Sequence, residues 1–514
     1  MIERVANAAD AARAERSINE LVDGYGEWLC SGGPDNSSTM LRRSECDFRV
    51  AHGRLIFSCW GERGAAAWRI NAWEWTGQKL LLEASRRAGA EGGVRLELIP
   101  RASLAALNAM VSATRRELCE RLARLACALR PGAVVERASL SAGARRGQPG
   151  SFARIVLRRG ARERIAVTGT VAAPGKTDVD GFLSSALVWF TRACEKTQTP
   201  SLHKLWLVGD ESSEALAGRL SLLRRDLRRV ISLFRIDQDW RALAAVELPE
   251  PDELWSARPL RFRRRPPPPV SRSAAEIIAL APDAIDVVRT RQGETLRFHG
   301  LAFARVRRLM KTESTWFGTE GAPGRRLLDE STKEEWTGLL RSLREHRHAG
   351  ASDRQHALYK AAPEAWLESL LRRDITRLDP GLILAPLYAQ FRTAVSDAAG
   401  SRPVDLLALR RDGRLVVIEL KVSADREHVI QGADYWRRVE IGRRSGRIRA
   451  ARLFGDAVIA DLPPLVYLVA PMLGFHRAYQ TLARCISPRI ELYRFDLGED
   501  WRAGPRVMRR GRSN

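Results

Sequence analysis

The sequence predicts an α/β protein with a β-rich region at its N-terminus and two successive copies of a mixed β-sheet flanked by helices. Residues 46–86 and 93–100 alternate apolar and polar side chains in short runs broken by glycine, a pattern typical of antiparallel strands. From residue 102 to 130 the apolar spacing becomes helical, and strands and helices then alternate as far as residue 241. The same succession returns in the second half of the chain, which predicts a duplicated fold.

A chain of 514 residues is longer than one hydrophobic core usually serves. The clearest boundary is a stretch in which four consecutive prolines follow a cluster of arginines, a composition typical of a semi-rigid linker. We also expect residues 276–514 to fold without the first copy. The predicted regions are a β-rich region at 1–100, the first copy at 101–247, the linker at 248–275, a β/α lead-in at 276–355 and the second copy at 356–514.

Matching segments of the two copies keep a nearly constant separation along the chain. They contain the residue pairs Gly132 and Gly381, Arg154 and Asp405, Leu205 and Val466, and Trp240 and Trp501. The separation changes once, where the second copy carries an extra loop. In this alignment Thr168 and Thr170 of the first copy correspond to Glu419 and Lys421 of the second.

The composition, with 45% hydrophobic and 28% charged residues, is that of an ordinary globular protein. The longest strongly apolar stretch, from Leu465 to Phe475, is shorter than the roughly 20 residues that a transmembrane helix needs. The N-terminal residues mix acids with arginines and contain no apolar segment typical of a secretory signal. We therefore expect a cytoplasmic protein with no membrane contact.

The formal charge of +24 favours a polyanionic partner, and DNA is the partner that we predict. Eight of the 85 basic residues are lysines, so a lysine at a given position is more informative than an arginine. The seven cysteines form no C-x-x-C pair, which argues against a zinc ribbon and against a disulfide framework. We interpret the histidine pair His346 and His348 as solvated residues of a charged segment.

The strongest chemical signal lies in the second copy. Residues 404–409 and 415–422 read as two strands joined by the turn RDGR. Because side chains alternate along a strand, Glu419 and Lys421 share one face, and Asp405 can join them from the neighbouring strand. This strand is apolar on both faces at its start and charged on one face at its end, which is typical of a covered strand that ends in a cleft.

Two carboxylates that converge repel each other unless a cation lies between them, and oxygen ligands favour Mg²⁺ or Mn²⁺ over zinc. Asp405 and Glu419 are thus predicted metal ligands, with the backbone carbonyl of Leu420 as a further one. Lys421 would lie near the attacking water and the scissile phosphate, where it could orient the water and stabilise negative charge.

These residues resemble the PD-(D/E)XK nuclease superfamily, in particular its RecB-like and NucS-type endonuclease domains. The resemblance extends over roughly residues 357–502 and rests on Asp405, on Glu419 and Lys421 as E-x-K, and on Gln431 and Tyr435 as Q-x-x-x-Y. It implies a restriction-endonuclease-like mixed sheet flanked by helices, and a helix over 426–439 that borders the active site. The literal P-D pair is absent, because Val404 separates Pro403 from the aspartate.

The resemblance also implies supporting roles for further residues. Gln431 would help to position the lysine or the DNA. An acidic residue of the preceding helix would complete the metal site, with Glu368 as the expected residue and Glu364 as its competitor. The predicted DNA contacts are Tyr435, Arg437 and Arg438.

The first copy has Arg154, Thr168 and Thr170 at the three catalytic positions, so the alignment predicts a degenerate nuclease-like domain without a metal site. A competing interpretation is a phosphate-binding loop that ends in Gly175, Lys176 and Thr177. Its spacing fails, since five residues rather than four separate the two glycines.

The sequence therefore predicts a metal-dependent DNA endonuclease of DNA repair or of defence against foreign DNA. The alternative is a non-catalytic DNA-binding protein on the same fold, and a nucleotide-driven enzyme is third. The sequence does not decide between a monomer and a homodimer.

Overall fold

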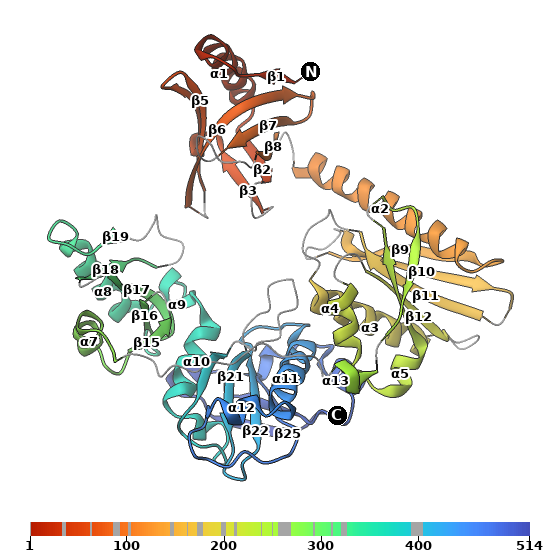
Figure 1. The fold of residues 1–514 in the computed structure, drawn as a ribbon, viewed down its shortest axis with the longest axis vertical. Helices are drawn as coiled ribbons and strands as arrows, with labels where there is room; N and C mark the ends of the chain where they lie inside the picture. Colours follow the sequence, from red (N-terminus) through yellow and green to blue (C-terminus); the bar gives the residue numbers. More distant parts are fainter. Residues whose placement is uncertain are drawn as a thin grey trace. The chain divides into compact units, whose positions relative to one another are not determined.

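The computed structural model (Figure 1) divides into two compact units, one of residues 1–114 and one that contains residues 115–320 and 325–514. The residues that it describes are 2–32, 37–61, 64–85, 93–100, 104–143, 149–161, 163–171, 178–196, 202–209, 213–237, 239–248, 250–254, 269–290, 293–309, 312–319, 326–391 and 404–514. Half of the predicted linker, residues 255–268, and part of the candidate phosphate loop, residues 172–177, lie outside these ranges.

In the N-terminal unit, one helix packs on an antiparallel sheet with the order β3-β2-β8-β7-β6-β5-β4 and with β1 beside β6. Trp28, Phe48 and Phe57 lie in its apolar core. The helix begins after Asn7, whose side chain accepts a hydrogen bond from the backbone of Asp10. The elements are β1 (Glu3–Arg4), α1 (Ala8–Asp23), β2 (Glu27–Gly32), β3 (Ser37–Arg42), η1 (Arg43–Glu45), β4 (Cys46–Ala51), β5 (Arg54–Gly61), β6 (Gly64–Trp75), β7 (Leu80–Ser85) and β8 (Val94–Pro100).

The predicted first copy contains a six-stranded mixed sheet with the order β14-β13-β12-β11-β10-β9. Leu122 and Ala126 pack in the core on one face of this sheet, and Phe182 and Leu187 pack in the core on the other. The elements are α2 (Leu104–Ala128), β9 (Val134–Ala142), β10 (Pro149–Arg159), β11 (Glu163–Thr170), α3 (Val179–Lys196), β12 (Lys204–Gly209), α4 (Ser213–Leu220), α5 (Arg225–Val230), β13 (Ile231–Ile236) and β14 (Leu243–Val246).

The predicted lead-in contains a smaller antiparallel sheet with the order β15-β16-β17-β18-β19. Leu296, Phe303 and Leu343 form part of its core. The elements of the linker and lead-in are α6 (Pro251–Leu254), α7 (Arg272–Ala279), β15 (Ile285–Thr290), β16 (Gly293–Phe298), β17 (Leu301–Leu309), β18 (Thr312–Phe317), β19 (Arg326–Leu327) and α8 (Lys333–His346).

The predicted second copy contains another six-stranded mixed sheet, with the order β20-β21-β22-β23-β24-β25. Its elements are α9 (Ala357–Lys360), α10 (Pro363–Arg373), η2 (Ile375–Arg377), β20 (Tyr388–Phe391), β21 (Val404–Leu409), β22 (Leu415–Leu420), α11 (His428–Arg444), α12 (Arg447–Ala450), β23 (Leu465–Pro471), η3 (Met472–Gly474), α13 (Tyr479–Cys485), β24 (Leu492–Leu497), η4 (Trp501–Ala503) and β25 (Val507–Arg512).

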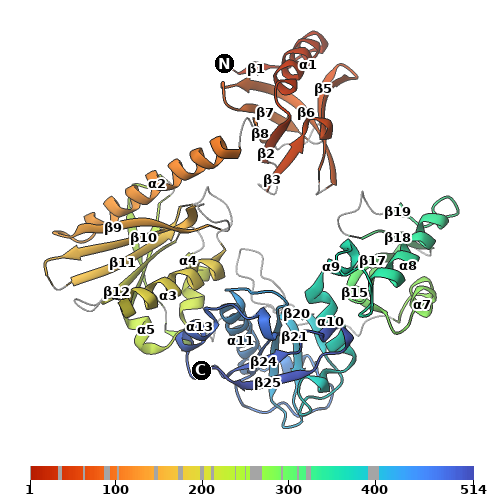
Figure 2. The ribbon, with the colours of Figure 1, turned by 180° about the vertical axis from the view of Figure 1, so that it is seen from behind.

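The central hairpin of this second sheet follows the sequence pattern closely. β21 and β22 are antiparallel, and every residue of β22 is buried, because α10 and α11 cover its two faces. The turn between the strands needs Gly413, which has φ +80° and would place a Cβ 2.6 Å from the carbonyl oxygen of Val458. Figure 2 shows α11 beside the same sheet from behind.

The two six-stranded sheets have the same strand order and the same pairing directions. In each, two antiparallel pairings are followed by two parallel pairings and a final antiparallel one. Thr168 pairs with Leu207 in the first sheet, and Glu419 pairs with Leu468 in the second, as the alignment of the two copies requires. Descent of the two copies from one ancestral domain remains a prediction.

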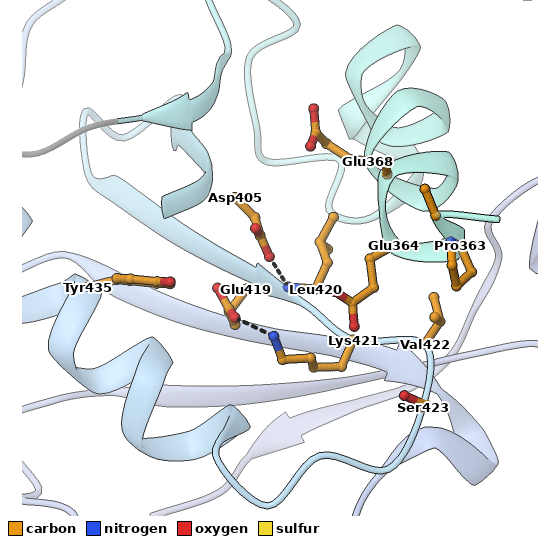
Figure 3. A pocket seen from close by; sticks show the side chains of 12 residues that line it. Pro363, Glu364, Glu368, Asp405, Glu419, Leu420, Lys421, Val422, Ser423 and Tyr435 are labelled. Carbon is orange, nitrogen blue, oxygen red and sulfur yellow. Dashed lines mark hydrogen bonds and ion pairs between the residues drawn. The ribbon is translucent and has the colours of Figure 1, made fainter. Parts of the chain in front are cut away.

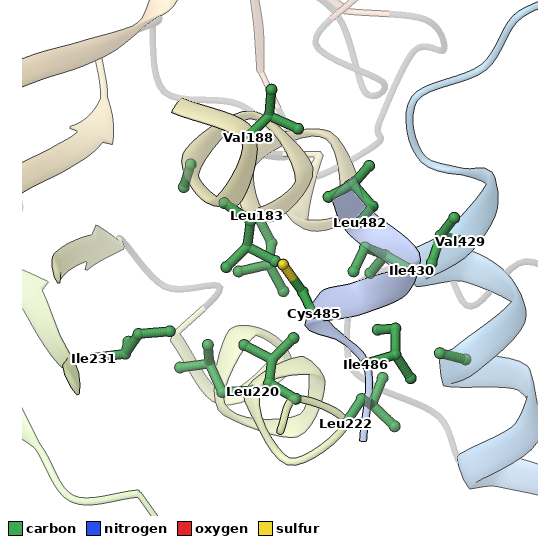
Figure 4. Close-up of a cluster of buried hydrophobic side chains, with 14 of the residues drawn as sticks. Leu183, Val188, Leu220, Leu222, Ile231, Val429, Ile430, Leu482, Cys485 and Ile486 are labelled. Atoms are coloured by element: carbon green, nitrogen blue, oxygen red, sulfur yellow. The ribbon is translucent and has the colours of Figure 1, made fainter. Parts of the chain in front are cut away.

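One apolar core joins the two copies. It contains Leu183 and Leu220 of the first copy together with Ile430 and Cys485 of the second (Figure 4). Leu223 and Ile486 form an antiparallel bridge, next to a hydrogen bond of 3.0 Å from the backbone nitrogen of Arg224 to the carbonyl of Cys485. The copies thus share buried surface within one compact unit.

Among the described residues, no helix is both long enough and apolar enough to cross a membrane.

Candidate active site

The ends of β21 and β22 and the start of α10 enclose a pocket of about 520 Å³ (Figure 3). It brings together Asp405, Glu419 and Lys421, the three residues that the strand pattern predicted to converge. The residues that line it are Ala362, Pro363, Glu364, Ala365, Glu368, Asp405, Glu419, Leu420, Lys421, Val422, Ser423 and Tyr435.

Asp405 is held in place by the backbone of the neighbouring strand. Its Oδ2 accepts a hydrogen bond of 2.9 Å from the backbone nitrogen of Leu420. Burial raises the pKa of Asp405 from 3.8 to about 6, although this hydrogen bond acts in the opposite direction. The environment therefore disfavours the charged carboxylate unless a cation is near.

Glu419 is 1% exposed and is the most deeply buried acid of the pocket. Its Oε1 accepts a hydrogen bond of 3.0 Å from Nζ of Lys421, whereas its Oε2 is buried and has no hydrogen-bond partner among the described residues. Burial, and then the charge of Asp405, raise the pKa of Glu419 well above its usual value. An unsatisfied carboxylate oxygen in such a place is suited to a cation.

Lys421 keeps its charge in this pocket. Burial would lower its pKa, but the negative charges of Glu419 and Glu364 more than offset that effect, so the pKa is raised. A second carboxylate, Asp425, lies 3.7 Å from the ammonium group. Asp425 was not predicted as a site residue, although its position four residues after Lys421 in the loop that leaves the strand could have indicated it.

Helix α11 borders the pocket, and its first turn fixes the end of β22. Nε2 of the buried His428 lies 3.2 Å from the carbonyl oxygen of Glu419, and burial lowers the pKa of this histidine to about 4, so the ring is neutral. The side-chain amide of Gln431 donates to Glu427 at 2.9 Å, and its Oε1 has no partner in the part of the chain that is described. Tyr435 lines the pocket, and burial followed by the nearby Glu419 raises its pKa.

Two acidic residues of α10 differ in where their carboxylates lie. Glu368 is buried and lies 3.1 Å from Arg297, which also pairs with Asp286 at 3.0 Å. Figure 3 shows the carboxylate of Glu368 above Asp405 in this view, whereas Glu364 extends toward Lys421. Besides burial, the negative charge of Glu368 contributes to the raised pKa of Asp405. Both residues line the pocket, Glu364 near Lys421 and Glu368 near Asp405. The arginine from β16 that pairs with Glu368 was not predictable from the spacing of the sequence.

Arg437 and Arg438 are 4% and 3% exposed, respectively, and both pair with the buried Asp434, at 2.7 and 2.5 Å. A third arginine, Arg219 of the first copy, lies 3.3 Å from the same carboxylate. These guanidinium groups neutralise a buried acid between the copies. The structure therefore gives no support to their predicted contact with DNA.

The pocket fits a divalent cation with few acidic ligands. Among the described residues, no group of three or more histidine, cysteine, aspartate and glutamate side chains forms a metal-binding cluster. Asp405 and Glu419 are two carboxylates with raised pKa values, and both can provide hard oxygen donors. One of these donors is Oε2 of Glu419, which has no hydrogen-bond partner in the described structure. Such a donor set suits Mg²⁺ or Mn²⁺, which retain several water ligands.

The corresponding positions of the first copy have no acidic side chain. Arg154 pairs with Thr168 across β10 and β11, and Oγ1 of Thr168 donates to the carbonyl of Ala153 at 2.6 Å. Thr170 lies at the end of the same strand. These side chains cannot provide the carboxylates that the second copy has.

The chain matches no family model and no curated protein. A solved structure described as "Structure of EndoMS in apo form" is similar to part of it, with 10% sequence identity, coverage of 41% of this chain and 88% of that chain, and a TM-score of 0.12. A TM-score this low does not establish a common fold.

Proposed function

We propose that this protein is a Mg²⁺- or Mn²⁺-dependent endonuclease that hydrolyses phosphodiester bonds of DNA. The observation that carries the proposal is the buried group of Asp405, Glu419 and Lys421, in which one carboxylate oxygen has no partner in the described structure. The similarity of the two copies, the PD-(D/E)XK resemblance and the charge of +24 also support a DNA endonuclease.

In this proposal Asp405 and Glu419 hold the cation, and the carbonyl of Leu420 is a third candidate ligand. The cation would supply Lewis-acid stabilisation of the phosphate and a lower pKa for a water molecule. Lys421, whose raised pKa keeps it charged, orients that water and stabilises negative charge on the phosphate. Glu364 keeps the ammonium group charged from the α10 side.

The test is incubation of the purified full-length chain with supercoiled plasmid in Mg²⁺, in Mn²⁺ and in EDTA. The wild-type protein should cut only with a metal, and Glu419→Gln should not cut. A panel of single-stranded, mismatched and branched DNA substrates extends the test beyond intact duplex. Binding of DNA without cleavage of any substrate would favour the alternative, a non-catalytic DNA-binding protein.

A further inference from the structure

Four arginines gather where the two copies meet, and we call them the arginine group: Arg137 of β9, Arg154 of β10, Arg192 of α3 and Arg426 of the loop before α11. Burial and then the positive charges of the other three lower the pKa of Arg154. In the register of β9 and β10, Arg137 pairs with Val156, so it lies diagonally beside Arg154 on the same face of the sheet. Arg192 lies one helical turn after Trp189, the ring that Arg154 covers.

Arg154 is the residue of the first copy that corresponds to Asp405. It pairs with Thr168 across the hairpin, as the register of β21 and β22 places Asp405 opposite Glu419. Its guanidinium donates to Oγ of Ser185 at 3.3 Å and lies 5.9 Å from the ring centre of Trp189, so α3 holds it on the face that α11 covers in the second copy. The position that carries a carboxylate in one copy thus carries a cation in the other.

The charges of the arginine group are not balanced within the described structure, because none of the four guanidinium groups lies within 4.0 Å of a described carboxylate. The neighbouring acid Asp425 is already paired with Lys421. Arg137, Arg192 and Arg426 are exposed, so an anion from solvent can reach them. Guanidinium groups in such an arrangement match the oxygens of a phosphate.

The arginine group also lies next to the loop of residues 421–427, which joins β22 to α11. A Cβ on Gly181, in the first turn of α3, would lie 3.0 Å from Oε1 of Glu427, so this helix packs directly on the loop that carries Lys421 at its start and Arg426 near its end. A phosphate held there would belong to the same nucleic acid that enters the pocket.

We propose that the arginine group binds a backbone phosphate of DNA, so that the first copy holds the substrate at the position where the second copy cuts. This inference rests on the proposed function, because it takes DNA as the ligand.

The test measures binding of a fluorescein-labelled DNA duplex by anisotropy in EDTA, so that no cleavage occurs, over a series of salt concentrations. Arg154→Gln and Arg426→Gln should each weaken binding by about tenfold and reduce the slope of log K against log salt by about 0.9. The matched control is Arg158→Gln, an exposed arginine of the same strand that donates to the carbonyl of Gly160, and it should change neither value.

Thermal unfolding separates binding from folding. Removal of one charge from a repulsive group should leave the melting temperature of Arg154→Gln unchanged or raised, and the exposed Arg426→Gln provides an independent variant. Wild-type affinity and slope in both variants would overturn the inference and leave the proposed function standing. Failure of the wild-type chain to bind DNA would overturn both.

Discussion

The ammonium group of Lys421 lies 3.0 Å from Oε1 of Glu419, and both side chains are buried in the same pocket. One positive charge thus faces the two carboxylates of Asp405 and Glu419, both of which have raised pKa values. The single ammonium group does not balance both carboxylates, and a divalent cation would supply the missing positive charge.

Glu419→Gln should reduce metal-dependent DNA cleavage by at least ~100-fold, because it removes a ligand charge and keeps the shape of the side chain. DNA binding in EDTA should persist, since the arginine group that we propose to contact phosphates is unchanged. Initial rates of plasmid cleavage in Mg²⁺ measure the loss. The control is Asp456→Asn, which alters a carboxylate that is 92% exposed and should cut at the wild-type rate. A Glu419→Gln protein with full activity would remove this residue from the mechanism.

Lys421→Arg should lose most activity although it keeps the charge. The guanidinium is larger and planar, and the ammonium group is held between Glu419 and Asp425 at 3.0 and 3.7 Å. Single-turnover cleavage at saturating DNA separates this loss from weaker binding. Lys333→Arg, on the surface of α8, is the matched control for the substitution itself. Equal rates for Lys421→Arg and wild type would show that a positive charge of any shape suffices.

Stability without metal should depend on pH through Asp405. Burial raises its pKa from the ordinary value of 3.8 to about 6 in the folded protein, so the folded state binds the proton more tightly. The unfolding free energy should therefore fall as pH rises from about 4 to about 6. Mg²⁺ should raise the melting temperature most at and above the upper end of this range, where protons no longer compete with the cation.

Asp405→Asn removes that contribution, because an amide oxygen can still accept the hydrogen bond from Leu420 but does not titrate. It also removes a negative charge that raises the pKa of Glu419, so both effects should flatten the pH dependence. Melting temperatures in EDTA and in Mg²⁺ between pH 4 and pH 8 are compared for the two proteins. Parallel curves for variant and wild type, with equal shifts in Mg²⁺, would contradict the assignment of Asp405 as a ligand.

The sequence was informative where local patterns decide the structure. Alternation within 415–422 predicted the shared face of Glu419 and Lys421, and the RDGR turn predicted the hairpin that adds Asp405. Long-range partners were not predictable from one sequence. Nothing in the spacing of α10 indicates that Arg297, on a strand of the lead-in, binds Glu368.

The burial of Arg437 and Arg438 between the two copies was also not predictable from the sequence. Arg437 and Arg438 look like surface residues of a basic helix, but they neutralise Asp434 beneath the first copy. The same shared core bears on the expectation that residues 276–514 fold alone. Ile430 and Cys485 pack against Leu183 and Leu220, so this fragment would expose an apolar surface that the full chain buries.

The proposed catalytic pocket has no acidic counterpart in the described residues of the first copy, so cleavage should produce nicks in duplex DNA rather than double-strand breaks. The first copy has Arg154, Thr168 and Thr170 where the second has the three proposed catalytic residues, so a bound chain should cut one strand at a time. With enzyme below the plasmid concentration, open circles should accumulate first, and linear DNA should appear only after a lag. Thr170→Ala should give the same time course, because this threonine ligates nothing in the reaction. Linear DNA formed from the start, at a rate that rises with the square of the chain concentration, would instead mean that two chains act together and supply two pockets.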